Sequence, residues 1–485
     1  MSFNSENYTN IPLSDGDSFH EECGVVGVYN HTDAAAHISL GLHALQHRGQ
    51  EAAGIVSFDG KSFHKHAAFG KVGSIFNKPN VMDSIAGNYA IGHNRYSTSG
   101  SKKNTNDIQP ILSELALGNI VLAHNGNLTN ANTLRKKLVS EGSIFSTTMD
   151  TEVIIHLLAT SKKSNLYDAI VYAMEQIKGG YALVAMSDDT MIGIRDPHGI
   201  RPLSLAKLGD GYVFASETCA FDILGAEFIR DVEPGELVII SKDGIESKKP
   251  IKDIKNRLCI FEYVYFSRPD STIDGRDVYT IRKKMGHELA KSFKDNFDHT
   301  IDVVIPVPDS GVASALGFSE ESGVPFELGI IRNHYVGRTF IEPTDNIRHL
   351  GVKLKHNANS SVIRGKSVML IDDSIVRGTT SKKIVDLVRA AGAKEVHMCI
   401  SSPPTTNPCF YGVDTPSKDK LIASKMTTED ISEYINADSL TFLNNIGLYK
   451  AVIGEDRNKN NPQFCDSCFT GDYPIELVDN ELGNN

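Results

Sequence analysis

Two adjacent acids at the end of an apolar run are the first residues here whose types and spacing suggest chemistry. They are Asp372 and Asp373, in the segment VMLIDDSIVRGTTS at 368–381. A loop of small residues follows them and includes Gly378, Thr379 and Thr380. Such a loop before a helix points backbone N–H groups and hydroxyls toward one place, which suits a phosphate. Acids beside it can reach ribose hydroxyls directly or through Mg²⁺. An isolated Asp-Asp pair is more often a solvated turn, so the surrounding segments decide between the two interpretations.

Cys23 could act as a nucleophile at a new N-terminus. The 22 residues before it contain five acids and no Lys or Arg. If residues 1–22 are removed as a propeptide, the α-amine of Cys23 can serve as the general base for its own thiol. A free α-amine has a pKa of about 7.7–8.0 and a thiol of about 8.5, both close to neutral pH. One residue then supplies both nucleophile and base. The alternative is a buried structural cysteine, which is the commoner case.

Four further segments, in this order, resemble the glutaminase half of the glutamine phosphoribosylpyrophosphate amidotransferase family. They are HALQHRGQEAAGI (43–55), IGHNRYSTSG (91–100), LAHNGNLTN (122–130) and TTMDTEVI (147–154). The resemblance implies that Arg95 binds the α-carboxylate of glutamine and Asp150 its α-amine. It also implies that Asn125 and the Gly126 N–H form the oxyanion hole, where one lost donor costs about 10²–10³ in rate. Arg48 receives a supporting role in the glutamine pocket.

The segment 368–381 resembles the signature of type I phosphoribosyltransferases, which form the second half of the same family. In VIPVPDSGVASA (304–315), Asp309 and Ser310 lie where the family has its pyrophosphate loop, and RNHYVGRTF (332–340) resembles its mobile flap. His334 departs from the Arg that relatives more often carry, and we assign it no role.

The resemblance implies phosphoribosyl pyrophosphate contacts from Arg332, Tyr335, Arg338, Lys355, Asp372, Asp373, Ser374, Arg377, Gly378, Thr379 and Thr380. It implies Mg²⁺ contacts from Ser310, Asp372 and Asp373. Between residues 332 and 355 there are five Lys or Arg against two acids, a local surplus that suits a pyrophosphate leaving group. The alternative for any one of these cations is a solvated basic loop.

Four cysteines could hold a metal. Cys465 and Cys468 form a C-x-x-C pair that places two thiolates within reach of one site. Cys259 and Cys409 fall where the Bacillus-type branch of the family has two more ligands. Four thiolates suit either a [4Fe–4S] cluster or tetrahedral zinc, and the residue types alone do not separate these. The resemblance implies the cluster, as a structural clamp that holds the C-terminal tail.

The elements around these residues follow two patterns. Up to about residue 255, strands and helices are grouped, which predicts sheets sandwiched by helices; the resemblance implies the αββα sandwich of N-terminal nucleophile hydrolases. Strands are expected at 23–29, 119–125, 181–186, 191–195, 212–217 and, closing the sheet, 236–240. Helices are expected at 34–46, 131–139, 151–159 and 167–177. Cys219 and Cys399 are expected on buried strands.

The second half alternates strand and helix, which predicts a parallel sheet whose ligands bind at the carboxyl ends of its strands. Strands are expected at 301–307, 325–331, 368–372 and 395–400, and helices at 312–322 and 381–391. The predicted organisation is a propeptide (1–22), a glutaminase domain (23–255), a phosphoribosyltransferase domain (256–460) and a C-terminal tail (461–485).

Composition limits the class of protein. With 485 residues the chain can build about two or three domains. The formal net charge of −11 argues against a general affinity for nucleic acid or anionic membrane. No apolar run approaches the roughly 18 residues of a membrane span, and the first residues do not resemble an export signal. We therefore expect a cytoplasmic protein whose seven cysteines are thiols or metal ligands.

These features predict an enzyme with two coupled half-reactions. Cys23 hydrolyses glutamine, and ammonia reaches phosphoribosyl pyrophosphate through a passage enclosed when the flap at 332–355 closes. The products are phosphoribosylamine, glutamate and pyrophosphate. The resemblance implies the first committed step of purine synthesis, feedback inhibition by purine nucleotides and a homotetramer.

Two alternatives remain at this stage. A hexosamine synthase would share the glutaminase half, but such enzymes have a sugar-isomerase domain in place of the IDDSIVRGTT segment. A purine-responsive regulator could keep the phosphoribosyltransferase fold as a sensor. The intact glutaminase motifs and the lack of a basic DNA-binding segment argue against it.

Overall fold

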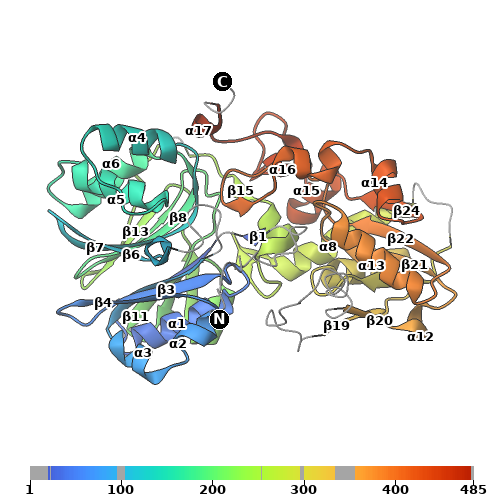
Figure 1. Cartoon of the computed structure of the whole chain (residues 1–485), viewed down its shortest axis with the longest axis horizontal. Coiled ribbons are helices and arrows are strands. Elements are labelled where there is room, and N and C mark those ends of the chain that lie inside the picture. Colours follow the sequence, from blue (N-terminus) through green and yellow to red (C-terminus); the bar gives the residue numbers. More distant parts are fainter. Residues whose placement is uncertain are drawn as a thin grey trace, which may run out of the picture.

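The computed structural model describes residues 20–21, 23–95, 104–252, 254–294, 300–333 and 356–481. These residues form two bodies that lie side by side (Figure 1). The first, blue to green in the figure, contains the strands between residues 24 and 248, and the second, yellow to red, contains most of the remainder. No helix in the described ranges is both long and apolar enough to cross a membrane.

Two antiparallel sheets lie face to face in the first body. The seven-stranded sheet has the order β12-β10-β11-β2-β5-β3-β4, and the six-stranded sheet has the order β14-β13-β9-β8-β7-β6. The first comprises β2 (Gly24–Tyr29), β3 (Ala52–Phe58), β4 (Phe63–Phe69), β5 (Tyr89–Arg95), β10 (Ser204–Leu208), β11 (Gly211–Ala215) and β12 (Glu227–Asp231). The second comprises β6 (Ile111–Leu115), β7 (Gly118–Leu128), β8 (Gly179–Met186), β9 (Met191–Arg195), β13 (Leu237–Ser241) and β14 (Gly244–Lys248).

Helices cover the outer face of each sheet. The seven-stranded sheet carries α1 (Ala34–Ala44), α2 (Val72–Phe76), α3 (Pro79–Ser84) and α7 (Cys219–Leu224), and the six-stranded sheet carries α4 (Ala131–Ser140), α5 (Thr151–Thr160) and α6 (Leu166–Gln176). Successive residues of a strand point to opposite faces, so Val25 packs between the sheets while Val26 packs under α1. This four-layer αββα sandwich confirms the predicted fold of the first half.

Two expectations for this half were wrong. The sheet does not close at 236–240, because β14 adds one more antiparallel strand beyond β13. Cys219 does not lie on a strand but begins α7, where buried residues at 220, 221 and 224 repeat with helical spacing. Its side chain is buried in the core, as expected, and so is that of Cys399.

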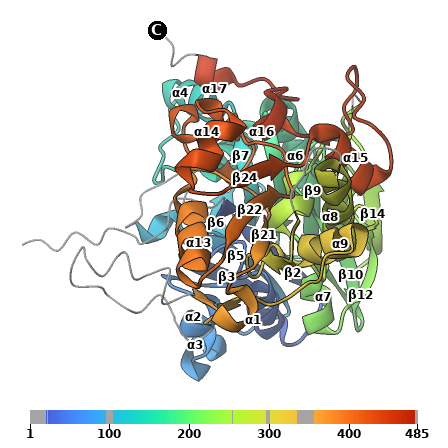
Figure 2. The ribbon, with the colours of Figure 1, turned by 90° about the vertical axis from the view of Figure 1, so that its right-hand side faces the viewer.

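The second body is built around a parallel sheet of order β18-β21-β22-β24. Its strands are β18 (Val303–Pro306), β21 (Ser367–Asp372), β22 (Glu395–Ile400) and β24 (Ser439–Phe442). Helix α13 (Thr379–Ala390) packs on one face, and α8 (Val278–Lys294), α9 (Val312–Ser322) and α15 (Asn445–Ile453) pack on the other (Figure 2). The parallel sheet predicted from the alternating pattern is confirmed.

The expected strand at 325–331 is largely absent. Only Phe326 forms a bridge, to Val304, and the next strand is β19 (Ile330–Arg332), which pairs with β20 (His356–Ala358). The Pro325 carbonyl accepts the Val304 N–H at 2.8 Å, and the Glu327 N–H donates to the Val304 carbonyl at 3.0 Å, so the pairing with β18 is limited to this one bridge.

The C-terminal tail crosses from the second body to the first. Strand β25 (Phe464–Cys465) pairs in parallel with β15 (Leu258–Cys259), and α16 (Ser467–Thr470) follows. The tail then reaches α17 (Val478–Glu481), which packs against α4 of the first body (Figure 1).

Candidate functional site

The acids at the end of β21 lie beside the loop that follows β18. The Val307 N–H donates to the Ile371 carbonyl at 2.8 Å, which holds the two strand ends together. Asp372 is the last residue of β21, and its Oδ1 accepts the Asp373 N–H at 2.9 Å. The Ser374 hydroxyl donates to Asp373 Oδ1 at 2.5 Å. Ser310, from the neighbouring loop, also hydrogen-bonds Asp373. The structure thus brings the predicted Mg²⁺ ligands together.

A buried cation that the sequence analysis did not single out lies near these acids. Arg282 of α8 donates from Nε to the Tyr263 carbonyl at 2.8 Å and from Nη2 to the Ser267 carbonyl at 2.7 Å. Burial raises the pKa of Asp373, while the hydroxyls of Ser310 and Ser374 and the charge of Arg282 act to lower it. The net direction is upward, and a bound cation would favour the ionised carboxylate.

Helix α13 begins two residues earlier than predicted, at Thr379, directly after the loop. Gly378 is its N-cap at φ +77°, and a Cβ there would lie 3.0 Å from Ile422 Cδ1, so glycine is required. Ser374 and Arg377 lie in the loop between β21 and this helix, and Thr380 lies in its first turn. Arg332, at the end of β19, forms an ion pair with Asp309. Tyr335, Arg338 and Lys355 lie outside the described residues.

Cys23 directly precedes β2 in the first body. Its side chain is buried, its φ is +103°, and its N–H donates to the Arg48 carbonyl at 3.3 Å. A non-glycine residue with such a φ is strained, and positions of this kind cluster at active sites. Of the residues before Cys23, the structure describes only His20–Glu21, which pair with Val413–Asp414.

The hydroxyl of Ser216 connects the start of β2 with Asn125. It accepts the Val25 N–H at 3.0 Å and the Asn125 side-chain Nδ2 at 3.4 Å. Asn125 is fully buried in β7. The next residue, Gly126, has φ +138°, and a Cβ there would lie 2.0 Å from the Gly180 carbonyl oxygen. The predicted oxyanion-hole residues Asn125 and Gly126 therefore lie on β7. The Ser216 hydroxyl links this strand to the start of β2, next to Cys23.

Asp150 is held as an anion close to the same strand. Its Oδ2 accepts the Leu128 N–H at 3.0 Å, and its Oδ1 is 3.5 Å from His124 Nδ1. Burial alone would raise the pKa of Asp150, but His124 and the backbone N–H bonds outweigh burial and lower it. A fixed carboxylate of this kind can bind an ammonium group.

Arg95 ends β5, which pairs with β2 so that Asn94 lies opposite Gly24. Its side chain is buried. The remainder of its predicted motif, residues 96–100, lies outside the described part of the chain. Among its neighbours, His93 Nε2 lies 3.1 Å from the His124 carbonyl, and burial lowers the pKa of His93 to about 3.

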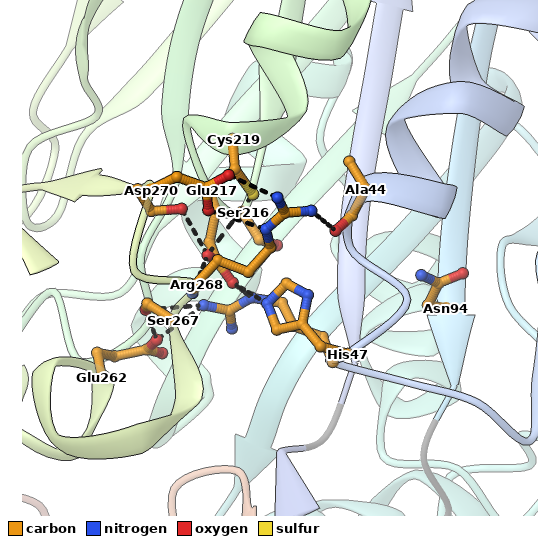
Figure 3. Close-up of polar contacts among 12 residues, drawn as sticks. Ala44, His47, Asn94, Ser216, Glu217, Cys219, Glu262, Ser267, Arg268 and Asp270 are labelled. Carbon is orange, nitrogen blue, oxygen red and sulfur yellow. Dashed lines mark hydrogen bonds and ion pairs between the residues drawn. The ribbon is translucent and has the colours of Figure 1, made fainter. Parts of the chain in front are cut away.

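Arg48 joins the two bodies. Its fully buried guanidinium forms an ion pair with Glu217 of the first body and another, at 2.7 Å, with Glu262 of the second. Glu217 also accepts hydrogen bonds from His47 at 2.6 Å and from the Ser271 hydroxyl at 2.7 Å. Figure 3 shows Glu217 among His47, Ser267 and Arg268 at this junction. The role of Arg48 in binding glutamine stays a prediction. Sequence reasoning missed its two acid partners, which lie 169 and 214 residues away and belong to no local motif.

The four predicted cluster cysteines gather on the second body. Cys259 and Cys465 are direct partners in the β15–β25 pair. The N–H groups of Thr406 and Asn407 both donate to the Cys468 carbonyl at 3.0 Å, which holds the segment preceding Cys409 beside the tail. Burial raises the pKa of Cys468, and the nearby thiols of Cys259, Cys409 and Cys465 raise it further. Burial likewise raises the pKa of Cys465 to about 12. Within the described ranges, no three Cys, His, Asp or Glu side chains surround a point as ligands of a single metal ion would.

Comparison with known proteins places both halves of the chain. A glutamine amidotransferase domain family matches residues 93–222, and a phosphoribosyl transferase domain family matches residues 278–412. An amidophosphoribosyltransferase of Rhizobium etli is 55% identical over 97% of this chain and 95% of its own length. The amidophosphoribosyltransferase of Bacillus subtilis is 47% identical over 96% of each chain.

Two solved structures have the same arrangement of both bodies. One is glutamine phosphoribosylpyrophosphate amidotransferase from Bacillus subtilis in complex with ADP and GMP, with a TM-score of 0.87 and 46% identity over 94% of this chain and 98% of that one. The other is described as the allosteric regulatory enzyme of purine biosynthesis, with a TM-score of 0.88 and 46% identity over 94% of this chain and 97% of that one.

Proposed function

The chain belongs to the amidophosphoribosyltransferase family, and from this premise we propose which residues perform its two half-reactions. The family activity transfers the amide nitrogen of glutamine to phosphoribosyl pyrophosphate. It gives phosphoribosylamine, glutamate and pyrophosphate, and is the first step of purine biosynthesis. The chain carries both the glutamine amidotransferase and the phosphoribosyl transferase domains that this reaction requires.

In the first half-reaction, Cys23 is the nucleophile once residues 1–22 have been removed. Its α-amine takes the thiol proton, and the thiolate attacks the amide carbonyl of glutamine. The Asn125 side chain and the Gly126 N–H stabilise the oxyanion that forms. Arg95 binds the substrate carboxylate and Asp150 its ammonium group. Ammonia leaves, and water then hydrolyses the thioester to release glutamate.

In the second half-reaction, ammonia attacks C1 of the ribose and pyrophosphate leaves. The loop after β21, from Asp373 to Gly378, and the start of α13 bind a phosphate of the substrate. Arg332, together with Tyr335, Arg338 and Lys355, contacts the substrate from the flap. The carboxylates of Asp372 and Asp373 and the Ser310 hydroxyl form an all-oxygen donor set, which fits Mg²⁺. When bound, Mg²⁺ would neutralise charge on the pyrophosphate.

Cys259, Cys409, Cys465 and Cys468 bind a [4Fe–4S] cluster that has a structural role. The β15–β25 pair places Cys259 beside Cys465, and the Cys468 carbonyl accepts hydrogen bonds from the segment that precedes Cys409. No step of the reaction involves the cluster, which would hold the tail against both bodies.

Further properties follow from the same relatives. Purine nucleotides inhibit the enzyme, a proposal supported by the ADP and GMP bound to the Bacillus subtilis relative. We propose a cytoplasmic homotetramer, as the family resemblance implies. The net charge of −11 argues against a general affinity for nucleic acid or anionic membrane.

The observation that most supports this assignment is the Ser216 hydroxyl bonded both to the start of β2 and to Asn125. The test uses the purified chain with glutamine and phosphoribosyl pyrophosphate. N-terminal sequencing should begin at Cys23, and glutamate and pyrophosphate should appear in equal amounts. Full synthetic activity in a chain that keeps residues 1–22 would contradict the role of the α-amine.

A further inference from the structure

Helix α4 begins without a cap from its own segment. It follows the turn at Thr129–Asn130, which leads out of β7. The side chain of Asn130, the N-cap residue, makes no capping bond. Its Nδ2 donates to the Gln176 carbonyl and its Oδ1 accepts the Lys178 N–H, both at 2.9 Å. The first N–H groups of a helix have no acceptor within the helix. Because the Asn130 side chain provides none, the acceptor for the first N–H groups of α4 must come from another part of the chain.

Asp479, in the C-terminal tail, supplies that acceptor. Its Oδ2 accepts the Asn132 N–H at 2.7 Å, and its Oδ1 accepts the Thr133 N–H at 3.0 Å and the Thr133 hydroxyl at 2.7 Å. Its own N–H donates to the Thr129 carbonyl at 2.9 Å. A carboxylate is also favoured at the positive end of a helix. Asp479 therefore caps α4 from a position 346–347 residues further along the chain.

The β7–α4 turn that Asp479 contacts lies next to the candidate glutamine site. Strand β7, which carries Asn125 and Gly126, ends at Leu128, and the Leu128 N–H is bonded to Asp150. Asp150 and Asp479 line the same cavity of ≈ 160 Å³, together with Arg135 and Phe410. A shift of the turn would consequently move both the candidate oxyanion donors and the candidate ammonium-binding carboxylate.

The tail is fixed from its other side by the second body. The Tyr411 hydroxyl donates to the Ile475 carbonyl at 2.7 Å and accepts the Ile475 N–H at 3.1 Å. The Asn127 side chain donates to the Phe410 carbonyl at 2.9 Å. The tail between Ile475 and Asp479 thus bridges the second body and the β7–α4 turn.

We propose that Asp479 is a positioning residue for glutamine hydrolysis, holding the β7–α4 turn from the C-terminal tail. The proposal rests on the assignment of glutamine hydrolysis to Cys23, Asn125 and Asp150. None of the contacts described for Asp479 involves the loop after β21. Loss of the cap should therefore impair synthesis from glutamine and leave synthesis from free ammonia unchanged.

The test compares Asp479→Ala with Asp479→Asn in the processed full-length enzyme. Loss of a helix N-cap costs about 1 kcal/mol, equivalent to a factor of about five. For Asp479→Ala we expect the KM for glutamine to rise about fivefold, while ammonia-dependent kcat changes less than about twofold. Asn keeps only one of the two acceptor oxygens of Asp479, so Asp479→Asn should give a KM between those of the wild type and Asp479→Ala.

Glu476→Gln is the matched control, because Glu476 lies in the same tail. Within the described residues, the one ion pair of its side chain is an exposed pair with Lys178. It should leave both activities unchanged. The proposal is overturned by an unchanged glutamine KM in Asp479→Ala, by equal losses with both nitrogen sources, or by equal impairment in Asp479→Asn. Failure of the assignment to Cys23 would appear separately, as glutamine-dependent synthesis that survives in Cys23→Ala.

Discussion

Asp150 and Asp373 are both buried carboxylates, yet their pKa values move in opposite directions. Burial dominates at Asp373 and raises its pKa, whereas His124 and backbone N–H bonds outweigh burial at Asp150 and lower it. Asp150 is therefore a permanent anion, suited to the ammonium group of an amino acid. The ionised form of Asp373 would be stabilised by a bound cation, because burial disfavours its charge.

His93 gives a pH-dependent prediction at the same scale. Burial lowers its pKa to about 3 in the folded chain, against about 6.5 when unfolded. The unfolded chain binds the proton first as pH falls below about 6.5, so His93 makes the folded state less stable as pH falls. Its contribution approaches about 1.4 kcal/mol per pH unit. Chemical denaturation between pH 6.5 and 5 should show a shallower loss of stability for His93→Gln than for wild type, and identical slopes would contradict the buried neutral imidazole.

At the scale of elements, the helices and strands that have a clear local hydrophobic pattern were predicted correctly from the sequence. The helix at 312–322 and the strands at 191–195 and 395–400 agree with α9, β9 and β22 at every residue. These segments combine clear periodicity with a clear stop signal, such as Gly323 in the left-handed region after α9. The segment expected as one strand at 325–331 divides between a single bridge to Val304 and β19, which pairs with β20, and local pattern does not specify this division. The acid partners of Arg48 were missed because they lie 169 and 214 residues away in the sequence.

Part of the candidate site was likewise predictable and part was not. Cys23, Asn125 and the 368–381 loop belong to continuous motifs, so the sequence identifies them. Ser216, Arg282 and Asp479 act on residues that lie 91, 91 and at least 346 positions away in the sequence. No local spacing of residues indicates these contacts.

Gly412 tests how closely the two bodies must approach at the oxyanion turn. It has φ +108°, and a Cβ there would lie 2.8 Å from Gly126 Cα. Gly412→Ala should force the second body away from Gly126 and lower glutamine-dependent synthesis by up to about 10²–10³-fold, which is the cost of losing one oxyanion donor. Ammonia-dependent synthesis should persist. The measurement is steady-state synthesis with each nitrogen source.

Gly209→Ala is the control for backbone strain alone. Gly209 has φ +58°, and a Cβ there would have nothing within 4 Å, so alanine meets only the conformational penalty. The substitution should cost about 1 kcal/mol of stability and leave both activities unchanged. If Gly412→Ala behaved like Gly209→Ala, close approach at Gly126 would not matter for glutamine hydrolysis.

At the scale of the whole molecule, buried charge and the C-terminal tail join the two bodies. Arg48 and Arg201 both reach Glu262, at 2.7 and 3.4 Å, and Arg195 reaches Asp274 at 2.9 Å. Buried pairs contribute little net stability, but removing one partner costs about 3–5 kcal/mol. Such pairs penalise other orientations of the two bodies.

The tail gives a metal-dependent prediction. Ligands as distant in the chain as Cys259 and Cys468 close a long loop, so cluster binding should stabilise the fold. Anaerobically purified protein should be brown, contain about four irons and four sulfides per chain, and lose colour and activity together in oxygen. Cys465→Ser should lose the colour and fold poorly. One zinc per chain, or no metal, would contradict the cluster, and unchanged colour in Cys465→Ser would show that the ligand set is wrong.

The central claim is that one chain contains two chemically separate sites, and two variants assayed with two nitrogen sources test it most directly. Cys23→Ser should lose phosphoribosylamine synthesis from glutamine and keep synthesis from ammonia, because ammonia enters after the thiolate step. Asp373→Asn should lose synthesis from both sources, because both share the loop after β21. Equal loss of both activities in Cys23→Ser, or intact ammonia-dependent synthesis in Asp373→Asn, would contradict the account.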